Sequence, residues 1–336
     1  MSTSLTSDLE TTGPRRVGVA GKIAVFAAKV VVTGVCFWYI ARQIDVSQVW
    51  SALRQLDVRW AALAVVLAML QIPLIALRWR NILQALAACN ERMTRAAIIA
   101  ITAIGAFFSQ VLPSVAGDGM RAWFVVRLGA RWRDALASVV IDRAVGAGLL
   151  IALGFLILLL PSGLTALRGY RTQVILVYGA VLFVALIALA LTPRIVPLLE
   201  RWRYTRWIGA LAADAHRALL GRTGPAILGL GCLVHTLTIA MVWLLGQAQG
   251  LALPLADAAV LFAIMVGVAL VPVSIGGWGL REVAVISLLG AHGVAPEQAL
   301  IFSVCFGLTL AIGALPGALV WLTYSVAPAA RTHARE

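Results

Sequence analysis

Apolar segments long enough to cross a lipid bilayer recur along the whole chain. About six runs between Lys22 and Val326 reach the roughly 20 residues that a transmembrane helix needs. Hydrophobic residues make up 62% of the 336 residues and charged residues only 12%, whereas soluble domains carry about 25% charged residues. The sequence therefore predicts an all-α polytopic membrane protein with about six transmembrane helices, and it excludes a soluble globular fold.

Arginine supplies nearly all of the net charge of +13, because Lys22 and Lys29 are the only lysines. The arginines lie in loops beside apolar segments, as positive-inside topology requires, and not on a basic module that would bind nucleic acid. Their distribution predicts cytoplasmic tails over residues 1–21 and 327–336, and one transmembrane domain over residues 22–326. We expect the protein to reside in a bacterial inner membrane, with no nucleic-acid partner.

The second predicted span, residues 60–77, is followed by Arg78, Trp79 and Arg80. Arginine and tryptophan are enriched where a helix leaves the bilayer. This triplet therefore predicts a membrane interface at residues 78–80.

The apolar run over residues 96–128 is broken near its middle by Pro113 and by a Gly-Asp-Gly sequence at residues 117–119. Arg92 precedes the run and Arg131 follows it. A single crossing would place basic loops on both faces of the membrane, which the positive-inside rule disfavours. The sequence therefore predicts a re-entrant helical hairpin over residues 96–128, with both flanking loops cytoplasmic.

A second broken segment, residues 258–290, contains Pro272 followed by three glycines within four residues. Its sequence from Pro272 to Arg281 resembles the stretch from Pro113 to Arg121. Three predicted spans separate the two segments, so the second would enter from the opposite face. The sequence thus predicts two oppositely oriented re-entrant hairpins that form an inverted repeat, a layout that places transport sites near the bilayer midplane.

Arginines and glycines at the two breaks are candidate binding residues, because ionisable side chains at membrane depth are rare and usually functional. Arg121 and Arg281 each follow a break, where a guanidinium could bind a phosphate. The alternative for Arg121 is that it belongs to the cytoplasmic membrane interface together with Arg127. Gly276 and Gly277 allow close approach of the backbone, and their N–H groups could contact an anion.

Asp142 and Arg143 are adjacent charged residues inside the third predicted span. They lie about 100° apart on a helix, so each needs a separate partner. The candidates are Asp118 or Glu282 for Arg143, and Arg121 or Arg281 for Asp142. A structural ion-pair role and a ligand-binding role are both open for this set. His235 also lies within a span, where a lone histidine more often bonds a neighbouring helix than relays protons.

The sequence contains no motif of soluble-type catalysis. There is no His-Glu-x-x-His, no Gly-x-Ser-x-Gly and no clustered acidic pair of the kind that a metal-dependent glycosyltransferase carries. We therefore predict no enzymatic activity, no catalytic residues, no metal and no cofactor.

Taken together and in this order, these motifs resemble the lysylphosphatidylglycerol synthase transmembrane family, also called flippase-like. The first half of the resemblance consists of Phe107–Ser114, Gly117, Asp118, Arg121, Asp142 and Arg143, and the second half of Pro272–Gly279, Arg281, Glu282 and Ser303. The resemblance covers nearly the whole chain. It implies a helical membrane domain with two re-entrant segments, which in multiple peptide resistance factor proteins flips aminoacylated phosphatidylglycerol and is fused to a synthase domain.

The sequence ends at Glu336, just past the last predicted span, so we expect the synthase domain to be absent and lysyl transfer not to occur. We expect a flippase-like protein that moves a phospholipid or lipid-linked headgroup, with Arg121, Arg143 and Arg281 on the phosphate. Its expected partners are that lipid and a separate lipid-modifying synthase or glycosyltransferase. A membrane-embedded transferase for a lipid or polyprenyl substrate, and an accessory subunit of a lipid-modifying enzyme, are the alternatives.

Overall fold

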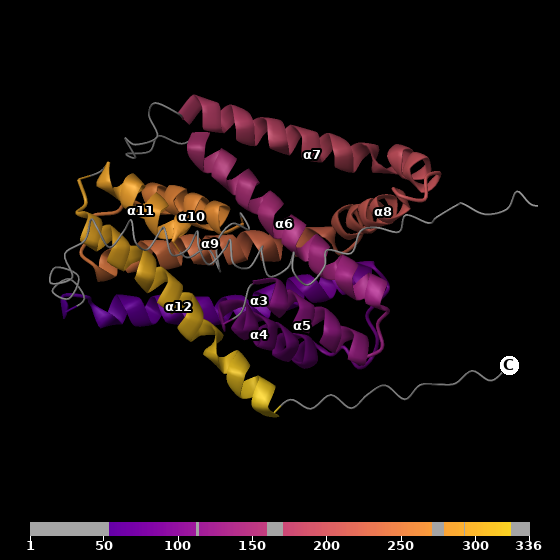
Figure 1. Cartoon of the computed structure of the whole chain (residues 1–336), viewed down its shortest axis with the longest axis horizontal. Helices are drawn as coiled ribbons and strands as arrows, with labels where there is room; N and C mark the ends of the chain where they lie inside the picture. The colour runs from indigo at the N-terminus through magenta and orange to yellow at the C-terminus, as the bar shows by residue number, and fades with distance from the viewer. Residues whose placement is uncertain (1–53, 112–113, 160–170, 271–278, 292, 324–336) are drawn as a thin grey trace, which may run out of the picture.

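The computed structural model describes the chain except residues 1–53, 112–113, 160–170, 271–278, 292 and 324–336 (Figure 1). Within these described residues every regular element is a helix. In chain order they are α3 (Val58–Ala85), α4 (Arg95–Val111), α5 (Ser114–Arg127), α6 (Trp132–Leu159), α7 (Arg171–Glu200), α8 (Arg206–Leu220), α9 (Gly224–Ala248), α10 (Leu255–Leu270), α11 (Leu280–Gly290) and α12 (Pro296–Thr323).

Five of these helices are long and apolar enough to cross a membrane, namely α3, α6, α7, α9 and α12. They correspond to five of the six predicted spans, while the first span, beginning at Lys22, lies outside the described residues. Their exposed surfaces are rich in large apolar side chains, such as Phe183 and Leu186 on α7. The predicted all-α polytopic membrane fold is confirmed.

Arg78 and Trp79, the first two residues of the predicted membrane interface at residues 78–80, lie inside the protein and within a longer helix. Helix α3 continues to Ala85, eight residues past the predicted end at residue 77. Arg78 and Trp79 are only 6% and 0% exposed. Trp79 Nε1 donates a hydrogen bond to Ser138 Oγ on α6 at 3.0 Å. These two residues lie in the protein interior because α6 supplies polar partners that a hydropathy pattern does not show.

The two predicted hairpins correspond to two pairs of short helices. Helices α4 and α5 pack against each other, and so do α10 and α11. The first pair crosses in near backbone contact, since a Cβ added at Gly117 would lie 2.0 Å from Ser109 Oγ and 2.2 Å from the Gly105 carbonyl oxygen. The breaks themselves, at residues 112–113 and 271–278, lie outside the described residues.

The long helices pack on the two short pairs in corresponding ways. The long helices α3 and α9 pack along each other, α12 packs on α4, and α6 packs on α10. The second helix of each short pair packs on the span that follows it in the chain, α5 on α6 and α11 on α12. The contact of α12 with α4 is very close, because a Cβ at Gly317 would lie 2.0 Å from the Ala103 carbonyl oxygen.

The apolar core divides into two main clusters along the bundle. One is built around α9, α10, α11 and α12 and includes Phe262 and Phe302. The other joins the last turns of α3 with α4, α5 and the start of α6, around Trp79. This second cluster lies at the end of the bundle where α3 ends and α6 and α9 begin (Figure 1). We call this end of the bundle the basic end, because its connecting loops contain Arg92, Arg131, Arg201, Arg203 and Arg222.

Candidate functional site

Five charged side chains form one network between α3, α5 and α6, which we call the arginine–aspartate network. Its members are Arg78, Asp118, Arg121, Asp142 and Arg143. Asp142 is central, because Oδ1 accepts a hydrogen bond from Arg78 Nε at 2.9 Å and Oδ2 accepts one from Arg121 Nη2 at 2.9 Å. Asp142 is only 2% exposed, so both of its oxygens exchange water for guanidinium partners.

Arg143, the next residue of α6, forms a two-bond pair with Asp118 on α5. Its Nε and Nη2 atoms each donate to one carboxylate oxygen of Asp118 at 2.9 Å. Arg121 Nη1 lies 3.6 Å from Asp118 Oδ1 and so links this pair to Asp142. Of the alternatives that the sequence left open, the pairs formed are Arg143 with Asp118 and Arg121 with Asp142.

Arg78 is the member of the network that the sequence did not predict. Its position at the end of a hydrophobic run is typical of an interfacial arginine. Asp142 is the feature that could have identified it. A carboxylate has two acceptor oxygens, so a buried aspartate can bind guanidinium groups from more than one helix.

The network contains one more cation than acid, with three arginines and two aspartates. Isolated charges are costly at low dielectric, and paired charges are much less so. The side chains of Arg78, Arg121 and Asp142 are at most 8% exposed, whereas that of Arg143 is 52% exposed. The surplus positive charge therefore adjoins an accessible edge, formed by Arg143 and Asp118, where an anion can approach.

Arg121 combines two features that favour an additional ligand. Its guanidinium lies over the Trp79 ring, with Cζ 4.2 Å from the ring centroid. Its Nε atom is buried and has no hydrogen-bond partner among the described residues. The ring holds the guanidinium in place through a cation–π contact, while one donor remains unused.

The second candidate set, Arg281 and Glu282, forms a separate cluster with Ser303 at the start of α11. Glu282 Oε1 accepts hydrogen bonds from Arg281 Nη2 at 2.7 Å and from Ser303 Oγ at 3.0 Å. Glu282 Oε2 accepts one from the Gly279 N–H at 2.6 Å, and Gly279 has φ +89°, a conformation that favours glycine. This cluster has no net charge, so each of its buried ions is balanced locally.

The predicted site residues therefore fall into two groups. Asp118, Arg121, Asp142 and Arg143 meet in the arginine–aspartate network, and Arg281 and Glu282 meet in the second cluster. Gly276 and Gly277 lie outside the described residues. Contact of either group with a lipid stays a prediction.

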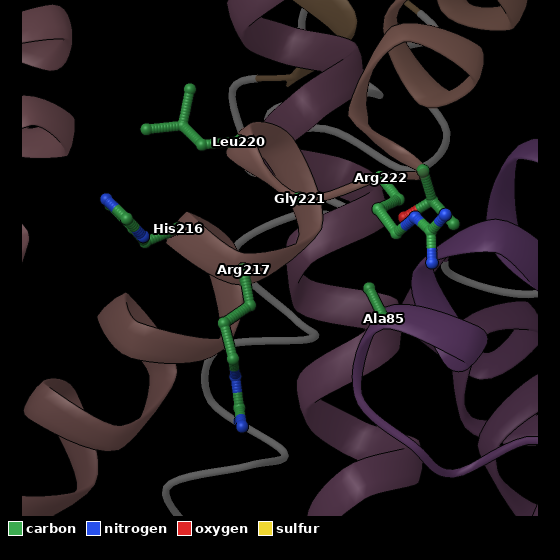
Figure 2. Close-up of a pocket in the computed structure, with 7 residues that line it drawn as sticks. Ala85, His216, Arg217, Leu220, Gly221 and Arg222 are labelled. Carbon is green, nitrogen blue, oxygen red and sulfur yellow. The ribbon is translucent and has the colours of Figure 1, made fainter.

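A pocket of about 420 Å³ lies at the basic end, between the last turns of α3 and α8 and the start of α9. Figure 2 shows that His216, Arg217 and Arg222 point in three different directions from the chain. Arg217 is in addition paired with Asp214, which also accepts a hydrogen bond from Arg133 at 3.0 Å. These cations do not converge on one ligand, so the arginine–aspartate network is the stronger candidate site.

Metal binding has no support in the described part of the chain. No group of three or more His, Cys, Asp or Glu side chains there could hold a metal ion.

Comparison with known proteins gives one family match. The model of the family described as the lysylphosphatidylglycerol synthase TM region matches residues 26–317, which include both groups of candidate residues. None of the curated proteins compared with this chain matches it.

Proposed function

Because the chain belongs to the lysylphosphatidylglycerol synthase transmembrane family, we propose that it moves a lipid with a phosphate-containing headgroup between the two leaflets of a bacterial inner membrane. The observation that carries the proposal is the arginine–aspartate network, with its surplus positive charge, its accessible edge and its buried interior. Charged groups at membrane depth that face the protein interior mark substrate pathways.

The headgroup phosphate enters at Arg143 in this proposal. The Arg143–Asp118 pair is the accessible part of the network, so the phosphate displaces the Asp118 carboxylate from the Arg143 guanidinium. A phosphate offers the same two-oxygen geometry to a guanidinium as a carboxylate does. Asp118 remains close to Arg121, at 3.6 Å, so its charge stays compensated during the exchange.

Arg78 and Asp142 hold the inner side of this site in the proposal. Asp142 holds the guanidinium of Arg121 through a hydrogen bond, and the Trp79 ring holds it through a cation–π contact. The unused Nε donor of Arg121 is then available to a second oxygen of the headgroup. The acyl chains stay in the lipid beside the apolar surfaces of the spans.

We propose further that α4–α5 and α10–α11 are re-entrant hairpins related as an inverted repeat. The reciprocal packing supports this, because α12 packs on α4 as α6 packs on α10. The three candidate spans between the pairs, α6, α7 and α9, also support it, since an odd number of crossings reverses the orientation of the second pair. Opposed hairpins give the headgroup access from each leaflet in turn.

The basic end faces the cytoplasm in this proposal, because arginines cluster in its loops. Trp202, just before α8, and Trp207, in the first turn of α8, are 69% and 66% exposed. Exposed tryptophans next to arginines are typical of a segment at the membrane surface. The arginine–aspartate network then opens toward the cytoplasmic leaflet.

The test is reconstitution of the purified protein into liposomes that contain a fluorescent phosphatidylglycerol or phosphatidylcholine in both leaflets. A membrane-impermeant reductant quenches only the outer leaflet, so a further loss of fluorescence measures translocation. We expect this further loss with the protein and not with protein-free liposomes. Absence of translocation for every lipid tested would contradict the proposal. Chemical change of an added lipid would then support a transferase, and a stably co-purifying lipid-modifying enzyme would support an accessory role.

A further inference from the structure

Helices α6 and α7 meet closely in one part of their length, which we call the α6–α7 contact. A Cβ added at Gly154 of α6 would lie 2.9 Å from Tyr178 Cε2 on α7, and a Cβ added at Gly179 of α7 would lie 3.2 Å from Phe155 Cε2 on α6. The contact lies toward the end of α6 and the start of α7, and from there the two helices diverge toward α8 (Figure 1).

Past this contact, α7 is exposed on every side. The six consecutive residues 183–188 are all exposed and all apolar. Six residues complete more than one turn of a helix, so their side chains point in all directions around the axis. No described helix therefore covers α7 at this level, and its side toward α6 is open to lipid.

Arg143 lies on the side of α6 that α7 covers at the contact. Gly154 follows Arg143 by 11 residues, which is about three turns, so the two residues lie on nearly the same side of α6. Phe155 follows Gly148 by seven residues, or about two turns. The face of α6 that contacts α7 at Gly154 and Phe155 thus continues, uncovered, to Gly148 and Arg143.

Open space adjoins the Arg143–Asp118 pair on both helices that form it. A Cβ added at Gly148 of α6 meets no atom of the described residues within 4 Å, and the same holds for Gly119, next to Asp118 on α5. The Arg143 side chain is 52% exposed. A ligand can therefore reach Arg143 from the space between α6 and α7, which we call the α6–α7 space.

The α6–α7 space has a cation at one end and apolar side chains along its length. Ala144, Ala147 and Ile151 lie on the α6 face between Arg143 and the contact, and none of them is buried. The 11 residues from Arg143 to Gly154 correspond to about 16 Å along the helix axis. This length is close to half of a hydrocarbon core about 30 Å thick, which is the depth that the acyl chains of one leaflet fill.

We propose that the α6–α7 space binds one acyl chain of the phospholipid whose phosphate is held by Arg143. This inference rests on the proposed lipid translocation and specifies a second contact of the same lipid. The surplus positive charge of the network attracts the phosphate to one end of the space. The space runs from Arg143 away from the basic end, which is the direction in which the chains of a cytoplasmic-leaflet lipid extend from their headgroup. Packing holds the chain there, since lipid tails are as apolar as the side chains.

The test locates the chain by photolabelling. The protein is reconstituted into liposomes that contain a phosphatidylglycerol with a diazirine on one acyl chain, and mass spectrometry finds the labelled residues after illumination. Surrounding lipid labels every exposed apolar surface, so the label on residues 144–151 is divided by that on Leu319 of α12, which is 68% exposed. We expect this ratio to fall about threefold or more in Arg143→Gln, because the charged partner of the phosphate is lost.

Gly148→Phe tests the space itself, because its ring occupies the position that the chain would fill. We expect a similar fall in the labelling ratio, with a melting temperature in detergent no lower than that of the wild type. Gly229→Phe on α9 is the matched control, since a Cβ at Gly229 also meets no atom of the described residues within 4 Å. If Gly148→Phe does not fold, Ala144→Leu narrows the same space by less and replaces it. An unchanged ratio in the space-filling variant, or an equal fall with Gly229→Phe, would overturn the proposal.

A protein occupant of the space would also overturn the proposal. Disulfide cross-linking of a Gly148→Cys variant to a second copy, or to Cys36 in the predicted first span, would identify such an occupant. The label is read without any movement of lipid, so the outcomes separate the site from the function. Label that depends on Arg143 and Gly148, with no translocation of any lipid, would refute only the proposed function. Translocation with a labelling ratio that neither substitution changes would refute only the acyl-chain site.

Discussion

The Nε atom of Arg78 donates a hydrogen bond to Asp142 Oδ1 at 2.9 Å, although the two residues are 64 positions apart in the sequence. The bond joins α3 to α6, and Arg121 brings α5 to the same carboxylate. One buried aspartate thus fixes three helices relative to one another. The position of the whole arginine–aspartate network depends on this single acceptor.

Replacing Asp142 with asparagine is expected to destabilise the protein strongly. The substitution leaves Arg78 and Arg121 buried without their shared counter-charge. Breaking a buried ion pair on one side costs about 3–5 kcal/mol. Thermal unfolding in detergent, followed by circular dichroism, measures the change.

Asp134→Asn is the control for that prediction. Asp134 pairs with Arg133, whose side chain is 59% exposed, and exposed pairs contribute only about 0–1 kcal/mol. A loss of stability with Asp142→Asn no greater than with Asp134→Asn would show that the network is not a structural anchor.

Gly117→Ala is expected to separate α4 from α5. The new methyl group would overlap Ser109 Oγ and the Gly105 carbonyl oxygen, at 2.0 and 2.2 Å. Overpacking of this kind costs about 1–3 kcal/mol. Gly119→Ala, on the same helix, is the matched control because a Cβ there meets nothing within 4 Å. We expect a lower melting temperature for the first variant only, and equal melting temperatures would contradict the close crossing.

The sequence predicts the charged pairs well because it restricts their partners. Few ionisable residues occur at membrane depth, and the adjacent Asp142 and Arg143 face different sides of one helix. Each therefore needs a partner from another segment, and the pairs with Arg121 and Asp118 were both among the alternatives. Choosing between Asp118 and Glu282 requires knowing which helices pack together, which a single sequence does not contain.

Arg78 shows the opposite case. A hydropathy pattern places an arginine at the end of an apolar run in the interface, because isolated burial would be costly. The cost is removed by Asp142 from a distant segment, so the same residue is buried. The local pattern of apolar residues does not show a partner from a distant segment. For the same reason it did not show that the helix continues past residue 77, where the predicted span ends.

Ser303→Ala is expected to destabilise the second cluster. The hydroxyl accepts a hydrogen bond from Arg281 Nε and donates one to Glu282 Oε1, each at 3.0 Å. Removing it leaves buried charged groups less well satisfied, at a cost of about 1–3 kcal/mol. The measurement is again the melting temperature in detergent. Ser287→Ala, on the exposed side of α11, is expected to change it little, and similar shifts in both variants would contradict this role of Ser303.

Cysteine labelling tests the orientation of the first hairpin. Cys89 lies in the connection between α3 and α4, and burial raises the pKa of its thiol, while nearby Arg80 partly opposes the shift. The thiolate is the reactive form, so we expect the labelling rate with an impermeant maleimide to be low at neutral pH and to increase as the pH rises. Labelling in sealed vesicles is therefore compared at several alkaline pH values.

The same assay is applied to Arg131→Cys, with the native cysteines replaced, since Arg131 follows α5 and is exposed. A re-entrant hairpin places Cys89 and position 131 on the same side of the membrane. Labelling of the two positions from opposite sides would show that α4 and α5 together cross the bilayer, and it would contradict the hairpin.

Arg143→Gln is expected to lower translocation of anionic lipid while leaving the fold nearly intact. The Arg143 side chain is 52% exposed, so loss of its pair with Asp118 costs only about 0–1 kcal/mol after screening by solvent. The surplus charge of the network disappears, because two arginines then face two aspartates. A phosphate headgroup loses both its entry donor and its electrostatic attraction.

We expect the rate for fluorescent phosphatidylglycerol in liposomes to fall by about tenfold or more, as the loss of a charge-assisted pair predicts. The rate for zwitterionic phosphatidylcholine should fall less, since that headgroup carries no net charge. Arg92→Gln, an exposed arginine of the basic end outside the network, controls for general loss of positive charge. Equal effects of the two substitutions would assign lipid preference to the basic surface and remove Arg143 from the headgroup site.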